Sequence, residues 1–309
     1  MQKLLELLQS TWVRVGFLAV AFGLCIWALV SQWDEIVAAV SALNVWSLFG
    51  ALLLGFVYVA ATFIAWRVVL RGFGTQIPLG AAARIFFVSQ LGKYLPGGIW
   101  NFLAAAELGK DHEIPRSKSV LVMFVSLLLS IATGIVLGAL ALLFGPAELR
   151  DRFWWVVLVL PLVAILLAPP VLNRALAFVA KKAKLGTSAP AISGTAVAAA
   201  TFWSLVAWLL AGGQVWTLAV AMGWEIGVDT FLLATAAYSL AWVAGFIMVF
   251  APAGVGVREA VLGAVLAPSI GSAAAIAVVL LSRVLLTIAD VVLGVAFVFA
   301  GRKHGVVSK

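Results

Sequence analysis

Residues 45–70 read VWSLFGALLLGFVYVAATFIAWRVVL, and this stretch decides the fold because almost every side chain in it is apolar. A helix needs roughly 20 apolar residues to cross the hydrocarbon core of a bilayer, and this stretch is longer than that. Further runs of similar length and composition lie at 13–30, 120–144, 153–172, 195–222, 231–250 and 272–300. The sequence therefore predicts several transmembrane helices.

The composition excludes a soluble protein. Hydrophobic residues make up 65% of the 309 residues and charged residues 10%, whereas soluble domains carry about 25% charge. The net charge of +8 does not indicate nucleic-acid binding, because the basic residues fall mostly in predicted loops, where they report membrane topology. The single Cys25 and the loop residues His112 and His304 form no set of metal ligands. We expect one integral membrane domain over 1–309, with no metal, cofactor or nucleic acid.

Two of the hydrophobic stretches are interrupted. Pro96-Gly97-Gly98 breaks the stretch 81–108, and the sequence APAGVG at 251–256 breaks the stretch 231–266. Proline removes a backbone donor and glycine weakens a helix, so each break is expected to start a new helix. Irregular backbone persists at membrane depth only where protein or a watery cavity covers it. Both breaks are therefore expected inside the protein.

The order of predicted elements repeats. Each half of the chain has a long helix, a shorter helix, the break, a short helix and a long helix. These helices are predicted at 44–71, 79–95, 98–109 and 117–144 in the first half and at 193–222, 229–250, 255–267 and 271–300 in the second. We therefore predict repeat 1 at 44–144 and repeat 2 at 193–300, with additional helices at 12–31 and 153–172.

The basic residues indicate how the segments cross the membrane. If both interrupted stretches are re-entrant, six helices cross fully and nearly all basic loop residues lie on the cytoplasmic side, as the positive-inside rule requires. Only Arg150 and Arg152 fall on the opposite side. The cytoplasmic residues are Lys3, Arg71, Lys110, Arg116, Lys118, Arg174, Lys181, Lys182, Lys184, Arg302, Lys303 and Lys309. Both termini are then cytoplasmic and the two repeats are inverted. If the interrupted stretches cross the membrane instead, the chain has eight crossings and both termini are again cytoplasmic. The alternative of eight crossings therefore stays open.

The predicted fold is thus an all-α polytopic membrane protein with about six full transmembrane helices and two re-entrant or broken helices, arranged as an inverted-topology repeat. Inverted repeats with a broken helix in each half are typical of transporters whose substrate site lies near the bilayer midplane.

Seven charged residues fall within the predicted membrane-associated segments. They are Arg84, Lys93, Glu107, Arg258, Glu259, Arg283 and Asp290. Each costs about 2.5–3.5 kcal/mol at the centre of a membrane helix, so these side chains should face the protein interior or a wet cavity. Four are basic and three acidic, so full internal pairing leaves one cation over.

Lys93 and Arg258 lie beside the two breaks, three residues before Pro96 and six residues after Pro252. Helix N-termini favour anions, and a nearby cation strengthens the site. We therefore predict that both residues bind an anionic lipid headgroup. The alternatives are that Lys93 extends to the membrane interface and that Arg258 pairs with acidic groups.

Arg283 and Asp290 are seven residues apart, about two turns, on one face of the last long helix. We expect each to meet a partner from an interrupted stretch, such as Glu259 for Arg283. For Arg283 and for Asp290, the sequence favours a structural ion pair and a direct role in transport equally. Glu107 is expected either to neutralise a buried cation or to reach the surface near a neighbouring lysine, and Arg84 has an interfacial position as its alternative.

Several uncharged residues at the breaks also belong to the predicted site. Gly97, Gly98, Gly254 and Gly256 permit tight turns and close approach of the backbone to a ligand, with plain helix packing as the alternative. Asn101 can hydrogen-bond a headgroup or cap a broken helix. The predicted substrate-binding set therefore contains these five residues and the seven charged ones.

The two interrupted motifs, QLGKYLPGGIWN at 90–101 and PAGVGVRE at 252–259, resemble those of the lysylphosphatidylglycerol synthase transmembrane-region family. That family includes the flippase part of the bacterial multiple peptide resistance factor and many stand-alone membrane proteins. The resemblance covers nearly the whole chain. The matching residues are Lys93, Pro96, Gly97, Gly98 and Asn101 in the first motif and Pro252, Gly254, Gly256, Arg258 and Glu259 in the second. Ala253 departs from the glycine that many relatives have.

The resemblance implies a flippase-like fold that moves phospholipids or polyprenyl-linked lipids between leaflets. About nine residues follow the last predicted helix, so we expect neither the soluble aminoacyl-transferase domain of some relatives nor lysyl transfer.

We therefore expect a lipid flippase or scramblase, and not an enzyme, in the cytoplasmic membrane of a bacterium or archaeon. One alternative is a membrane partner or anchor of a lipid- or glycan-modifying enzyme, acting through the lysines at 181–184. Another is a membrane enzyme that acts on lipid-linked substrates, which needs acid–base or metal-binding groups that the predicted helices lack. Membrane lipids with anionic headgroups are the expected partners, and a homodimer or a complex with a lipid-modifying enzyme stays open.

Overall fold

The computed structural model describes residues 34, 37, 41, 43–95, 99–144, 154, 158–182, 191–247 and 256–304. The described chain forms helices and no strand, which confirms the all-α prediction. The helices are α4 (Val45–Gly72), α5 (Leu79–Gln90), the 3-10 helix η1 (Leu91–Tyr94), α6 (Trp100–Lys110), α7 (Arg116–Phe144), α9 (Val159–Leu167), α10 (Pro169–Lys182), α11 (Gly194–Ala221), α12 (Val228–Ile247), α13 (Val257–Ile270) and α14 (Ser272–His304). The helix predicted at 12–31 lies outside the described residues.

Within the described residues, five helices are long and apolar enough to cross a membrane: α4, α7, α11, α12 and α14. The bent pair α9 and α10 supplies a sixth crossing if it forms one span. By contrast, α5 and α6 have 12 and 11 residues, so each is shorter than about 20 Å and cannot cross roughly 30 Å of hydrocarbon alone. The protein is therefore a multi-pass membrane protein.

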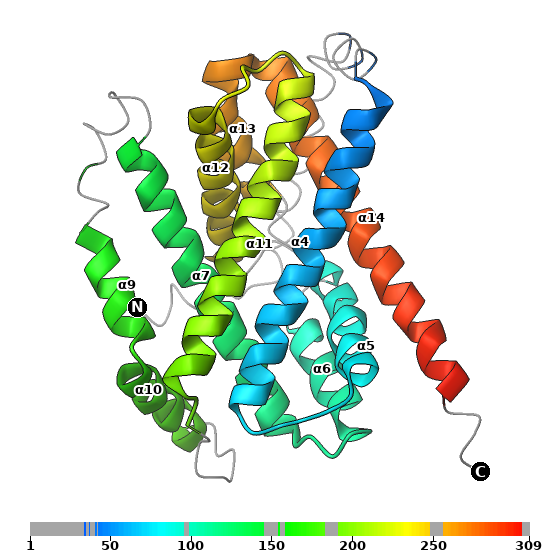
Figure 1. The fold of residues 1–309 in the computed structure, drawn as a ribbon, viewed down its shortest axis with the longest axis vertical. Helices are drawn as coiled ribbons and strands as arrows, with labels where there is room; N and C mark the ends of the chain where they lie inside the picture. Colours follow the sequence, from blue (N-terminus) through cyan, green and yellow to red (C-terminus); the bar gives the residue numbers. More distant parts are fainter. Residues whose placement is uncertain are drawn as a thin grey trace, which may run out of the picture.

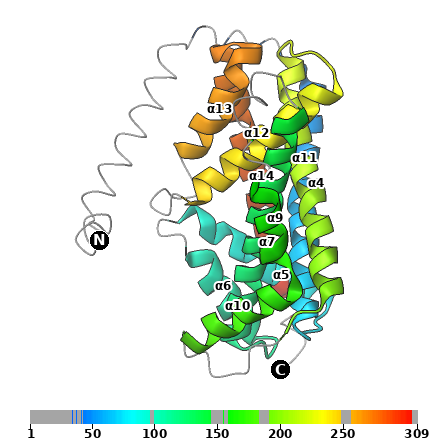
Figure 2. The ribbon, with the colours of Figure 1, turned by 90° about the vertical axis from the view of Figure 1, so that its left-hand side faces the viewer.

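In each half, two long helices enclose two shorter ones. In Figure 1, α4 and α11 run side by side over nearly the full height in opposite directions, and they pack against each other extensively. Figure 2 shows α5 and α6 in the lower half of the molecule and α12 and α13 in the upper half. The two sets of shorter helices, α5 with α6 and α12 with α13, thus approach the middle of the molecule from opposite ends.

Local sequence signals explain where the long helices begin and end. The Asn44 side chain accepts a hydrogen bond from the Trp46 N–H, and Ser193 does the same for Ala196. Such capping satisfies backbone donors that have no partner inside the helix. Gly223 follows the end of α11 with a φ of +97°, a left-handed conformation that glycine adopts without a Cβ penalty. The helices predicted at 44–71 and 193–222 are therefore confirmed to within a residue at each end.

The prediction of one helix at 153–172 was wrong. The chain bends by 69° between α9 and α10, and Ala168 between them has an extended ψ of 128°. Proline disfavours the helical conformation in the residue before it and is well placed at the first position of a helix, so Pro169 ends α9 and starts α10. As a result, the backbone of Lys181 and Lys182 lies in α10 and not in a loop.

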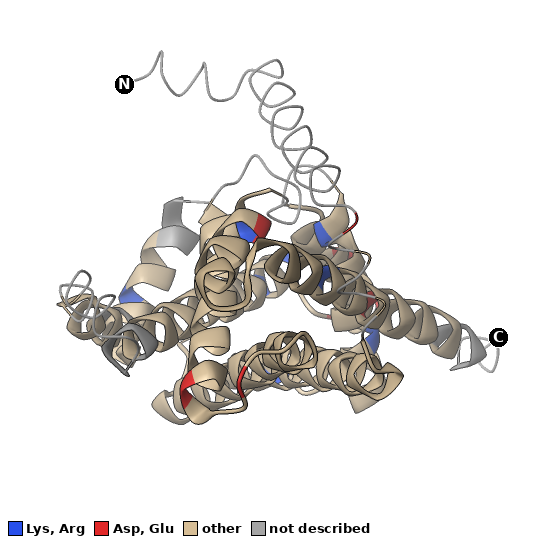
Figure 3. Cartoon of the chain, turned by 90° about the horizontal axis from the view of Figure 1, so that it is seen from above, with Lys and Arg blue, Asp and Glu red and all other residues tan. Residues whose placement is uncertain are grey.

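Aromatic side chains form the core between α4, α5 and α14. Phe63 packs against Phe86 and Phe87 at centroid distances of 5.6 and 5.1 Å, and Phe87 stacks on Phe297 at 5.0 Å. Seen from above, the helices carry few charged residues (Figure 3). Large apolar side chains such as Phe49 are exposed to the surroundings, as lipid-facing side chains of a membrane protein are.

The contact between α11 and α12 gives a test of this packing. A Cβ on Gly212 would lie 2.6 Å from the Cβ of Thr235, whereas a Cβ on the neighbouring Gly213 meets Phe231 at an ordinary 3.5 Å. We predict that Gly212→Ala destabilises the protein by about 1–3 kcal/mol through overpacking. The measurement is the apparent Tm of detergent-purified protein, followed by size-exclusion chromatography after heating.

Gly213→Ala is the matched control, because alanine favours a helix by up to about 1 kcal/mol over glycine. Its Tm should equal or exceed that of the wild type. Equal Tm values for the two variants would contradict the close contact between α11 and α12.

Candidate functional site

A cavity of about 320 Å³ lies where both sets of helices meet. Its wall takes residues from α4, α5, α6, α7, α11, α12, α13 and α14, and from η1. The charged residues in the wall are Lys93, Arg258, Arg283 and Asp290. The cavity therefore combines charged residues near both interrupted segments, although these segments lie far apart in the sequence.

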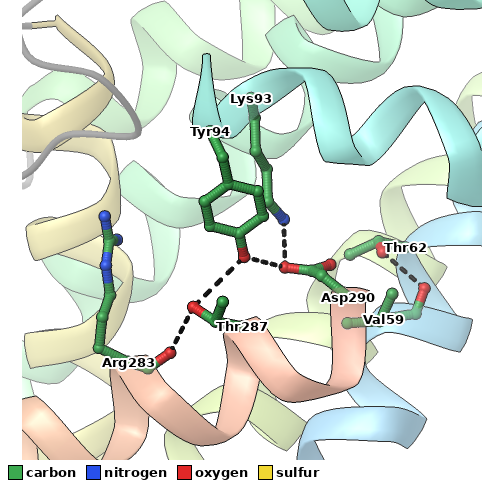
Figure 4. Close-up of polar contacts among 7 residues, drawn as sticks. All are labelled: Val59, Thr62, Lys93, Tyr94, Arg283, Thr287 and Asp290. Carbon is green, nitrogen blue, oxygen red and sulfur yellow. Dashed lines mark hydrogen bonds and ion pairs between the residues drawn. The ribbon is translucent and has the colours of Figure 1, made fainter. Parts of the chain in front are cut away.

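The first cation of the cavity is paired. The Lys93 Nζ lies 2.6 Å from the Asp290 Oδ2, and the Tyr94 hydroxyl donates a 2.6 Å hydrogen bond to the same oxygen (Figure 4). Lys93 and Tyr94 belong to η1, which directly precedes the first break, and Asp290 is a residue of α14 with 4% exposure. Lys93 therefore binds a protein carboxylate in the wall of the cavity.

The second pair forms as predicted. The Arg283 Nε lies 3.2 Å from the Glu259 Oε1, and the other Glu259 oxygen accepts a 2.6 Å hydrogen bond from the Gly256 N–H. Gly256 has a φ of +89° and immediately precedes α13, a conformation that favours glycine. Glu259 thus caps α13 and neutralises a cation of α14.

Arg258 differs from both paired cations. Its guanidinium carbon lies 4.5 Å from the centroid of the Tyr238 ring, and Tyr58 packs edge-on against that ring at 6.1 Å. Among the described residues, no carboxylate approaches Arg258 within 4.0 Å. An aromatic face attracts a cation without neutralising it. Among the cations in the cavity wall, Arg258 is therefore the one without a carboxylate partner in the described chain.

Several polar atoms of the cavity wall have no hydrogen-bond partner. In the described chain these are Trp66 Nε1, Asn101 Oδ1, Tyr238 OH and Asp290 Oδ1, all of them buried atoms. A buried polar group without a partner costs about 1–3 kcal/mol. Their concentration around one cavity indicates that the region accommodates polar groups. Asn101 was predicted as a site residue, and the structure places it in the wall.

The structure places two predicted site residues away from the cavity. Glu107 is exposed and lies 2.8 Å from the Lys110 Nζ and 2.6 Å from Arg116, and these hydrogen bonds lower the pKa of its carboxyl group. Arg84 lies 3.9 Å from Asp111. Both therefore have partners near the ends of α6 and α7, outside the cavity wall.

The other predicted glycines, Gly97, Gly98 and Gly254, lie outside the described residues. The described chain contains no group of three or more His, Cys, Asp or Glu side chains placed to hold a metal ion.

Sequence reasoning missed the tyrosines of the site. The chain has three tyrosines, and Tyr58, Tyr94 and Tyr238 all line the cavity. Their scarcity in a chain rich in tryptophan and phenylalanine is the signal that could have identified them. Arg67 was also overlooked, although it interrupts the apolar stretch 45–70. Its Nε is buried without a partner in the described chain, outside the cavity wall.

The pairing of Asp290 leads to a prediction about stability. Removing one member of a buried ion pair costs about 3–5 kcal/mol when the other charge stays buried, and less when that charge is partly exposed, as Lys93 is at 34%. Asp290→Asn leaves Lys93 without a carboxylate, so it should lower the apparent Tm of the detergent-purified protein strongly. Asp111→Asn is the matched control, since an exposed ion pair contributes about 0–1 kcal/mol. A wild-type Tm for Asp290→Asn would contradict the pairing.

Comparison with known proteins places the chain in a family. The family described as lysylphosphatidylglycerol synthase TM region matches residues 13–294, a range that includes both interrupted segments and the whole cavity wall. No curated protein matches the chain. The family match confirms the resemblance of the two motifs. The chain therefore belongs to the lysylphosphatidylglycerol synthase TM region family.

Proposed function

We propose that this protein moves a lipid with an anionic headgroup between the leaflets of the membrane, as a flippase or scramblase does. The observation that carries the proposal is Arg258, a cation in the wall of the central cavity with no carboxylate within 4.0 Å among the described residues. An uncompensated cation in a membrane interior is costly. An anionic headgroup that visits the cavity offsets this cost.

The chemistry of the wall supports a phosphate ligand. The Arg258 guanidinium offers a planar fork of donors that matches phosphate oxygens. Arg258 is the second residue of α13, where backbone N–H groups and the helix dipole also favour an anion. Lys93 adds an ammonium group that is 34% exposed and has donors to spare beyond its bond to Asp290. In this proposal the headgroup passes through the cavity while the acyl tails stay in the bilayer.

The family supports the lipid part of the proposal, because it is a membrane domain of lipid-related proteins. The proposal places the protein in the cytoplasmic membrane with both termini in the cytoplasm. In its support, Arg71 lies in the last turn of α4, Lys110 ends α6 and Arg116 begins α7. These helix ends share the lower side of Figure 1. The cargo crosses without chemical change.

Replacement of Arg258 tests the proposal. In proteoliposomes with trace phosphatidylglycerol that carries a fluorescent acyl chain, wild-type protein should expose inner-leaflet lipid to a membrane-impermeant quencher faster than protein-free vesicles do. Arg258→Gln should lower this rate at least tenfold, because it removes the cation without a carboxylate partner.

Arg174→Gln, the same change at an exposed position on α10, should retain the wild-type rate. The proposal fails if folded Arg258→Gln protein moves the lipid as fast as wild type, or if wild type moves it no faster than protein-free vesicles.

A further inference from the structure

The charges around the cavity can be counted pair by pair. Three cations line it: Lys93, Arg258 and Arg283. Two carboxylates balance them, Asp290 against Lys93 and Glu259 against Arg283. Among the described residues in the wall and their ion-pair partners, one positive charge is left, and it belongs to Arg258.

Both carboxylates are held in fixed positions by more than one donor. Asp290 accepts from Lys93 and Tyr94, and Glu259 from Arg283 and the Gly256 N–H. Neither carboxylate can move toward Arg258 without losing these bonds, each of which involves a charged group and is therefore strong. The surplus of one positive charge is consequently a fixed property of the site.

A poorly solvated site binds a ligand best when the net charge of the ligand is equal in size and opposite in sign to the net charge of the site. Any charge that is not cancelled stays buried without a partner, which is costly. A phosphodiester carries one negative charge and cancels the surplus. A phosphate monoester carries nearly two above pH 7, which leaves one negative charge over. A zwitterionic headgroup brings no net charge, and its own cation would lie in a positive region.

We propose that the cavity selects monoanionic phosphodiester headgroups over zwitterionic headgroups and over phosphate monoesters. This inference rests on the proposed function, because it specifies the cargo of the same cavity. The selection depends on the number of charges in the wall, so a change in that number should change the preferred headgroup.

A panel of lipids with the same labelled acyl chains tests the inference in wild-type proteoliposomes at pH 8. The probes are phosphatidylglycerol as the diester monoanion, phosphatidylcholine as the zwitterion and phosphatidic acid as the monoester. Phosphatidylglycerol should move at least ten times faster than either of the others. Equal or faster movement of phosphatidic acid or phosphatidylcholine overturns the inference and leaves the proposed function standing. Movement of none of the three above the rate of protein-free vesicles overturns both.

Adding a cation to the cavity wall tests whether the net charge of the wall selects the headgroup, and it leaves Arg258 unchanged. Ser126 lies on α7 in the cavity wall, and its hydroxyl is already bonded to the Val122 carbonyl at 2.9 Å. Ser126→Lys raises the surplus to two, so phosphatidic acid should become faster than phosphatidylglycerol. Ser117→Lys, the same change in the first turn of α7 outside the wall, should keep the wild-type order.

Leu127→Lys is the second variant if Ser126→Lys does not fold, since Leu127 also lines the cavity. Reversal of the headgroup order in either folded variant supports the inference. Retention of the phosphatidylglycerol preference by a folded variant with a lysine in the wall overturns it.

Discussion

The cost of a charge in an apolar interior constrains this structure more than any other single factor. On α14, Arg283 and Asp290 face opposite charges from the two interrupted segments, Glu259 and Lys93 respectively. The two α14 residues are separated by about 10 Å along the helix. Because separation of either pair leaves buried charges unpaired, the segments on both sides of the cavity are held against the same helix. The polar cavity between them follows from this arrangement.

Most of the fold could be predicted because the signals for membrane helices are local. Apolar length predicts the long helices, and the capping residues Asn44 and Ser193 determine where two of them begin. The bend at Pro169 was missed because hydropathy is continuous across it, although the proline pair at 169–170 was visible in the sequence. A hydropathy signal reports burial in lipid, and it does not report the direction of the backbone.

The site was predicted less completely, because pairing between side chains depends on three-dimensional distance. The sequence identified Lys93 and Arg258 as equivalent cations beside two breaks, yet the first is neutralised by Asp290 and the second rests on Tyr238. Nothing in the spacing of the two motifs predicts this difference. Glu107 illustrates the same limit, since its nearest partners are Lys110 and Arg116, at the exposed ends of their helices.

The difference between the two motifs bears directly on function. An ion pair with a fixed carboxylate neutralises a cation and stabilises the fold, but it also removes most of the attraction for a visiting anion. An aromatic face such as Tyr238 holds the Arg258 guanidinium in position and leaves its charge intact. The proposed binding of an anionic headgroup therefore rests on this difference, because Arg258 has no carboxylate within 4.0 Å in the described chain and lines a cavity of about 320 Å³.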